Sequence, residues 1–152
     1  MADAGGKLDA KGGSRSAARR RALDVLYEAD LLEAPIEVAL GRQLERPGPD
    51  AGPLDAYAVE LVSGVDRRQA EIDQRIGAAA EHWTVKRMPL VDRNVLRIGT
   101  YELLDQPDVP TAVILNEAVE LAKLLSTPES GRFVNGVLAA VAKGARPEAP
   151  GR

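Results

Sequence analysis

Apolar residues recur along most of the chain at spacings of three and four, the period at which side chains share one face of a helix. The first such segment begins at Arg15 and is expected to end before Pro35. Its apolar face consists of Ala18, Ala22, Val25, Leu26, Ala29 and Leu32. Arg20 and Arg21 lie off this face, and we expect both side chains to point toward solvent. Residues 1–14 are rich in glycine, alanine and charge, and they predict a flexible N-terminal tail.

The same spacing predicts two further helices in the first half of the chain. A short helix opens at Pro35 and directs four apolar residues inward, namely Ile36, Ala39, Leu40 and Leu44. Residues 47–53 contain three prolines and predict a loop. A long helix then begins with Asp55 as its N-cap and continues to about Ala79. Gly64, inside that helix, either weakens it or marks close packing.

The second half of the chain predicts more helices and no sheet. Thr84 is placed to cap a single turn that ends near Met88. The pattern then predicts a helix over 89–104, an extended connector over 106–110, a helix over 113–125, a turn over 126–131 and a helix over 133–141. From Gly144 the chain is expected to form a flexible C-terminal tail, residues 144–152. No stretch alternates long enough to indicate a strand, so the predicted fold class is all-α, with one helical domain of about seven helices over residues 15–143.

The amino-acid composition excludes several kinds of catalytic and metal site, but it says less about the fold. The 152 residues suit one domain, and 45% of them are apolar, which is enough for a core. The chain has no cysteine, which excludes disulfides, a thiol nucleophile and cysteine zinc sites. His82 is the only histidine, and we expect it to have a structural or surface role. Phosphate-binding loops, dinucleotide-binding glycine motifs and nucleophile elbows are absent, so we expect no catalytic site, no metal and no cofactor.

Charge is distributed unevenly along the chain. Residues 1–21 carry six basic and two acidic side chains, whereas residues 22–152 carry 14 basic and 21 acidic ones. A basic arm on an acidic body suggests a polyanionic partner, although a merely solvated tail is an equal alternative. Arginine forks bind phosphates and stack on bases, which favours RNA. The longest apolar run, Val137–Ala142, is too short to span a membrane and no signal peptide is evident, so we expect a cytoplasmic protein.

Three motifs in the second half resemble the NusB family of bacterial transcription antitermination factors. Val91–Leu104, with the sequence VDRNVLRIGTYELL, resembles the central helix of that family. Ile114–Lys123, with the sequence ILNEAVELAK, is similar to its next helix. Phe133–Leu138 matches its closing FVNGVL motif. The order and spacing agree over roughly residues 14–142, which makes the resemblance specific.

The resemblance implies an all-helical fold and a role without catalysis. Family members pair with the ribosomal protein NusE, bind single-stranded boxA RNA and help RNA polymerase to read through terminators in ribosomal RNA operons. By position, the resemblance assigns RNA binding to Arg15, Arg19, Arg20, Arg21, Tyr27, Glu129, Arg132 and Phe133. It assigns NusE binding to Asp92 and Arg93, which we expect to be solvated charges on an otherwise apolar helix.

Several alternatives remain open at the level of the sequence. The chain could be a protein-interaction module that binds no RNA directly, or, less consistently with the absent cofactor motifs, a fragment of an RNA-modifying enzyme. Phe133 suits a core position as well as it suits base stacking. The sequence does not distinguish a monomer from a homodimer.

Overall fold

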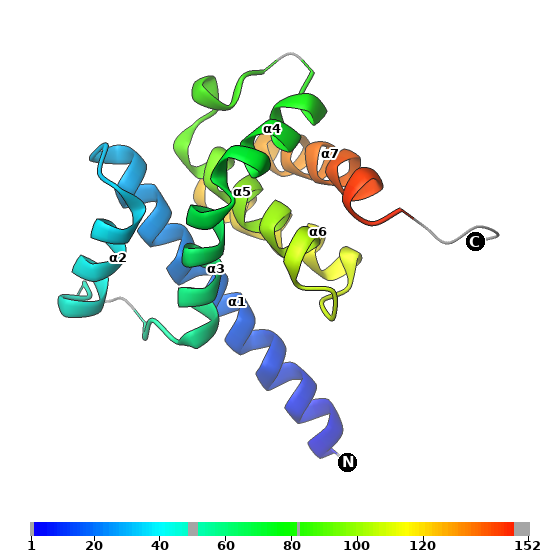
Figure 1. Cartoon of the computed structure of the whole chain (residues 1–152). Helices are drawn as coiled ribbons and strands as arrows, with labels where there is room; N and C mark the ends of the chain where they lie inside the picture. Colours follow the sequence, from blue (N-terminus) through cyan, green and yellow to red (C-terminus); the bar gives the residue numbers. More distant parts are fainter. Residues whose placement is uncertain (1, 49–51, 82, 148–152) are drawn as a thin grey trace. The chain divides into compact units, whose positions relative to one another are not determined.

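A computed structural model describes residues 2–48, 52–81 and 83–147 of the chain (Figure 1). All regular elements in these ranges are helical, which confirms the predicted all-α class. The helices are α1 (Ala2–Leu31), α2 (Ile36–Glu45), α3 (Ala56–Arg67), α4 (Gln69–Ala79), the 3-10 turn η1 (Val85–Arg87), α5 (Leu90–Asp105), α6 (Thr111–Leu125) and α7 (Pro128–Ala145). None of these helices is long and apolar enough to cross a bilayer.

The chain divides into two compact units, Met1–Ser63 and Gly64–Arg152. In the first unit α2 packs against α1, and the apolar face predicted for α1 is buried from Ala18 to Ala29. The α2 prediction is only partly right, because Ala39 is buried whereas Leu44 is exposed. The structure also begins α1 at Ala2 rather than at Arg15. Residues 2–14 contain four glycines, which disfavour a helix, but no proline, which would stop one.

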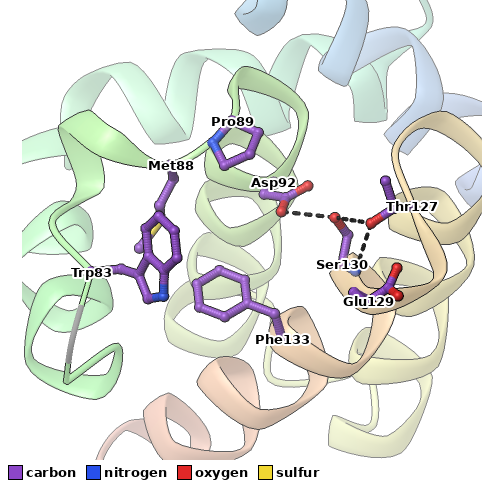
Figure 2. A pocket seen from close by; sticks show the side chains of 8 residues that line it. All are labelled: Trp83, Met88, Pro89, Asp92, Thr127, Glu129, Ser130 and Phe133. Atoms are coloured by element: carbon purple, nitrogen blue, oxygen red, sulfur yellow. Dashed lines mark hydrogen bonds between the residues drawn. The ribbon is translucent and has the colours of Figure 1, made fainter.

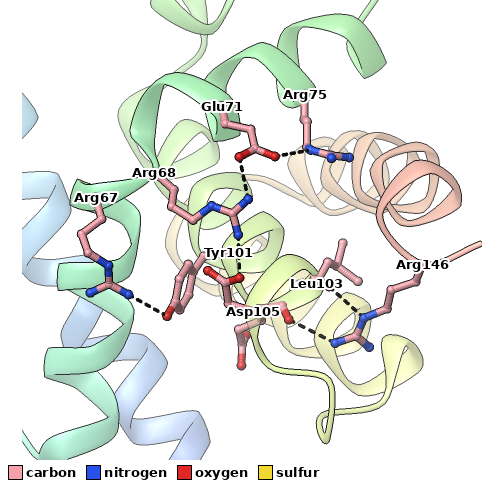
Figure 3. A network of polar contacts seen from close by, with 9 residues as sticks. Arg67, Arg68, Glu71, Arg75, Tyr101, Leu103, Asp105 and Arg146 are labelled. Atoms are coloured by element: carbon pink, nitrogen blue, oxygen red, sulfur yellow. Dashed lines mark hydrogen bonds and ion pairs between the residues drawn. The ribbon is translucent and has the colours of Figure 1, made fainter.

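The helix predicted over 55–79 is two helices in the structure. Asp55 caps α3 as expected, since its Oδ1 accepts a hydrogen bond from the Ala58 amide at 3.0 Å. The helical path breaks at Arg68, whose side chain bonds Asp105 of α5 and Glu71 of α4 (Figure 3). Gly64 marks close packing, because a Cβ there would lie 2.1 Å from the Tyr101 ring.

In the second unit α5 packs against α4, α6 and α7. It is buried along most of its length, from Asn94 to Leu103, as expected for a helix with apolar residues on two sides. Tyr101 lies in this core beside Gly64. The α5 helix therefore forms the framework from which the surrounding residues of this unit are positioned.

The beginning and end of α7 differ from the sequence prediction. Residues 126–131 were expected to form a turn, but α7 begins at Pro128, and Thr127 caps it by accepting the Ser130 amide at 3.1 Å. Thr84, in contrast, makes no capping hydrogen bond through its side chain. At the other end α7 continues to Ala145, beyond the predicted start of the tail. The rest of that predicted tail, residues 148–152, lies outside the described residues.

Arg146 follows α7 and closes the connection between α5 and α6. Its guanidinium donates to the carbonyls of Glu102, Leu103, Gln106 and Val109, at 2.6–3.1 Å. The extended connector predicted over 106–110 is therefore a tight turn. The Arg146 guanidinium bonds carbonyls of this turn and of the end of α5. Figure 3 shows Arg146 reaching back from the end of α7 to this turn.

Candidate nucleic-acid interface

The first candidate surface is the arginine segment, which we define as Arg15, Arg19, Arg20 and Arg21 of α1. These four side chains do not share one environment. Arg20 is exposed, Arg15 is half-buried, and Arg19 and Arg21 are buried. The guanidinium of Arg15 lies 4.8 Å above the centre of the Tyr57 ring of α3. The segment therefore offers less free charge than its composition indicates.

Arg21 corrects the expectation that it points toward solvent. Its side chain is only 4% exposed. Nε donates to the carbonyl of Gly52 at 2.8 Å, Nη2 donates to Gln43 of α2 at 3.2 Å, and Nη1 pairs with Asp24 at 3.0 Å. Position 21 lies beside the apolar face of α1 rather than opposite it, so a long side chain reaches the neighbouring elements. Arg21 thus links three parts of the first unit.

Arg20 and Tyr27 remain on the accessible side of α1. Both are exposed. They lie seven residues apart, so they stand about two helical turns, or about 10 Å, apart on the same face. Of the predicted contacts on α1, these two are the most accessible.

The second candidate surface is the aromatic pocket of the second unit, with a volume of about 270 Å³. Its lining is largely apolar and comes from the segment before α5, from α5 and from the start of α7, as Trp83, Met88, Pro89, Asp92, Thr127, Glu129, Ser130 and Phe133. Figure 2 shows Trp83 and Phe133 beside each other below Asp92. Their ring centroids are 6.3 Å apart and the ring planes are inclined by 66°. Phe133, Glu129 and Asp92, predicted as separate contacts, therefore meet in one pocket.

Asp92 is buried in this pocket, which contradicts the expectation of a solvated charge. Its residue is 4% exposed, and Oδ2 accepts a hydrogen bond from Ser130 Oγ at 2.9 Å. Within the part of the chain that the structure describes, Oδ1 has no hydrogen-bond partner. That oxygen is fully buried, so it is a desolvated acceptor inside the protein rather than an accessible contact for a ligand.

The other predicted residues around the pocket are accessible. Glu129 and Arg132 are exposed, and Phe133 is half-buried, so its ring both packs and faces the pocket. Arg132 also lines a neighbouring polar groove with Lys123 of α6 and Asn135. Arg93 is half-buried and donates to the carbonyls of Val85 and Lys86 at 3.0 and 2.7 Å.

Sequence reasoning missed Trp83 and the two cations that follow it, Lys86 and Arg87. All three are exposed. The available signal was a tryptophan placed three and four residues before two basic residues, in a segment without apolar periodicity. His82 lies outside the described residues. Among the residues that are described, no group of histidine, cysteine or carboxylate side chains is arranged to hold a metal ion.

Comparison with known proteins shows one consistent family. The model described as "NusB family" matches residues 16–143. The chain is 54% identical over 129 residues to the transcription antitermination protein NusB of Acidothermus cellulolyticus, covering 84% of this chain and 86% of that protein. A T. maritima NusB structure aligns with a TM-score of 0.76 at 35% identity, covering 88% and 93% of the two chains. A structure of antitermination factors NusB and NusE with double-stranded RNA aligns with a TM-score of 0.74 at 32% identity, covering 86% and 96%.

Proposed function

Because the chain belongs to the NusB family, we propose that it is a transcription antitermination factor that binds boxA RNA together with NusE. The RNA-bound complex would act on RNA polymerase and promote read-through in ribosomal RNA operons, in the cytoplasm and without catalysis. The observation that carries this proposal is the match of the family model to residues 16–143, which contain the aromatic pocket and all of the arginine segment except Arg15. The similar NusB chain solved with NusE and double-stranded RNA supports NusE and RNA as the two kinds of partner.

The aromatic pocket supplies the features that single-stranded RNA requires. Unpaired bases stack on aromatic rings and present hydrogen-bonding edges, while cations neutralise the phosphates. Here Phe133 offers a ring, and Arg132 offers an exposed cation. A planar base fits these groups better than a phosphate does, because the pocket lining is mostly apolar.

The arginine segment supplies phosphate contacts, and we assign them unequally. Arg20 is exposed and Arg15 is half-buried, so these two are the segment's main contacts in the free protein. Arg19 and Arg21 would contribute after local rearrangement, because both are buried. Tyr27 adds an exposed ring on the same face of α1 as Arg20.

We assign NusE binding to the start of α5, where Asp92 and Arg93 lie. Arg93 is the more accessible of the two, and its bonds to the carbonyls of Val85 and Lys86 hold η1 against α5. A partner that binds this region would contact both η1 and α5. Asp92 would act mainly through the shape of the pocket, because it is buried.

Fluorescence anisotropy with labelled boxA RNA tests the proposal, with and without NusE, over a series of salt concentrations. We expect binding that strengthens with NusE and weakens as salt rises, because phosphate contacts release counterions. A double-stranded RNA of the same sequence serves as the comparison. Absence of RNA binding even with NusE would contradict the proposal and favour a protein-interaction module.

A further inference from the structure

Trp83 lines the aromatic pocket, yet its side chain is 52% exposed. It is nevertheless held in place, because its backbone amide donates to the Ala80 carbonyl at 2.7 Å and its ring contacts Phe133. Burying an indole would stabilise the fold, so a fixed indole that stays in water indicates a surface kept open for a ligand.

The ring geometry leaves an apolar face for a planar ligand. Trp83 and Phe133 meet edge to face, with the ring planes inclined by 66°. Such a contact covers the face of one ring and only the edge of the other. Met88, which is buried, forms the base of the same pocket (Figure 2). The pocket therefore has two aromatic walls and an apolar base.

Cations follow Trp83 in the turn that leads to α5. Lys86 and Arg87 of η1 are both exposed. They stand between Trp83 and Pro89, and both of these residues line the pocket. Arg93 fixes the backbone of the turn by donating to the carbonyls of Val85 and Lys86. The charge of the turn is thus positive beside an apolar pocket.

From this arrangement we infer that Trp83 is a second stacking wall for an RNA base, and that Lys86 and Arg87 contact the phosphates next to that base. The inference deepens the proposed function and rests on it. Single-stranded RNA is the occupant that the surface favours, because it combines a planar apolar group with regularly spaced negative charges. An apolar peptide would use the rings but would leave both cations without partners.

The wild-type protein gives a direct measurement, because Trp83 is the only tryptophan in the chain. Its intrinsic fluorescence is followed while a single-stranded boxA RNA of about 12 nucleotides, within the usual site size, is added together with NusE lacking tryptophan. We expect saturable quenching, with a midpoint that equals the one measured by RNA anisotropy. The emission is first recorded with NusE alone, so that any change caused by NusE is subtracted from the RNA titration.

Variants of the full chain separate stacking from charge. Trp83→Leu should weaken RNA binding about tenfold, and Trp83→Phe should retain most of the affinity. Lys86→Ala with Arg87→Ala should lower the log–log salt slope by about 1.4, because each lost phosphate contact removes about 0.7. Leu124→Ala is the matched control, since Leu124 is an apolar residue of the same unit that is 66% exposed and lies outside the pocket.

The outcomes distinguish this inference from the proposed function. If wild-type protein binds RNA but saturation leaves the Trp83 emission unchanged, or if Trp83→Leu binds as tightly as Leu124→Ala, the inference is wrong and the proposed function stands. If Trp83→Leu weakens NusE binding but leaves RNA binding unchanged, the Trp83 ring contacts NusE rather than RNA, and the inference is also wrong. If wild-type protein with NusE binds no RNA, both fail. Thermal melting of each variant verifies its fold.

Discussion

The arginine segment and the aromatic pocket differ in opposite directions between what the sequence contains and what the structure leaves accessible. The sequence of the arginine segment is rich in positive charge, but some of these side chains are buried, and Arg21 is bonded within its own unit. In the aromatic pocket the sequence shows few aromatic residues, but packing leaves Trp83 open to solvent. The contrast teaches that accessibility, rather than composition, decides which residues can bind a partner. A run of three arginines is therefore not equivalent to three available cations.

Removing the Arg21 side chain should produce the largest effect and would test the first half of this contrast. Arg21→Ala leaves the Gly52 carbonyl and the Gln43 side chain without their donor, so we expect a loss of about 2–3 kcal/mol in the free energy of unfolding. Urea denaturation provides the measurement. Arg20→Ala is the matched control on the neighbouring exposed residue, and its stability should stay within about 0.5 kcal/mol of wild type. Equal losses in the two variants would show that Arg21 is as solvated as Arg20.

The second-largest effect is expected on RNA affinity at Phe133, the aromatic residue that the sequence resemblance identified. Phe133→Leu keeps an apolar side chain at a half-buried position but removes the stacking face, so RNA affinity should fall by about 1–2 kcal/mol. Affinity is measured by anisotropy with NusE present. Val113→Ala, at an exposed apolar position on α6, should leave affinity unchanged. An unchanged affinity for Phe133→Leu would assign that ring to the core alone.

A smaller effect is expected from the accessible cations of α1. Replacing Arg15 and Arg20 together with alanine should reduce the log–log salt slope of RNA binding by about 1.4, corresponding to two lost phosphate contacts. Adding Arg19→Ala and Arg21→Ala should lower stability more than it lowers the slope further, because both side chains are buried. If the slope falls equally at each of the four positions, the buried arginines are freed when RNA binds.

The smallest effect is expected from a half-exposed network of Arg68, Glu71 and Arg75, which contrasts with the buried Arg21. Glu71 accepts hydrogen bonds from Arg68 and Arg75, and these bonds lower the pKa of its carboxyl group (Figure 3). A lowered pKa in the folded state means that the stabilisation is present above the ordinary pKa of glutamate and disappears as the pH falls through the lowered value. Glu71→Gln should therefore be slightly less stable than wild type at neutral pH and indistinguishable in strong acid. Melting temperatures across acidic and neutral pH would reveal this, and a difference that grows in acid would contradict it.

The repeating pattern of apolar residues predicted the helical class and most helix positions, because burial of one face is a local property of the sequence. It did not predict the break at Arg68, whose side chain bonds Asp105, 37 residues away. The start of α7 was readable, since Thr127 followed by Pro128 is a typical N-cap with proline in the first turn, and the interpretation as a turn overlooked it.

For the candidate interface, the sequence resemblance named Phe133, Glu129 and Asp92, and the structure places them around one pocket. Periodicity could not show that Asp92 is buried, because its partner Ser130 lies 38 residues along the chain. Nor could it show that Arg21 reaches Gly52 and Gln43. The roles of Phe133, Glu129, Asp92 and Arg21 in binding RNA or NusE stay predictions until the measurements above are made.

The bonds of Arg146 also have a consequence for how the protein is made. The ribosome synthesises α5, the turn and α6 well before it reaches position 146. During that interval the carbonyls of Leu103 and Val109 lack the donor that Arg146 supplies, and those of Glu102 and Gln106 accept the backbone amides of Gln106 and Val109 but not yet the guanidinium. The guanidinium that later gathers them arrives from the far end of α7. Vectorial synthesis therefore leaves the junction between α5 and α6 as one of the last parts of the second unit to be secured.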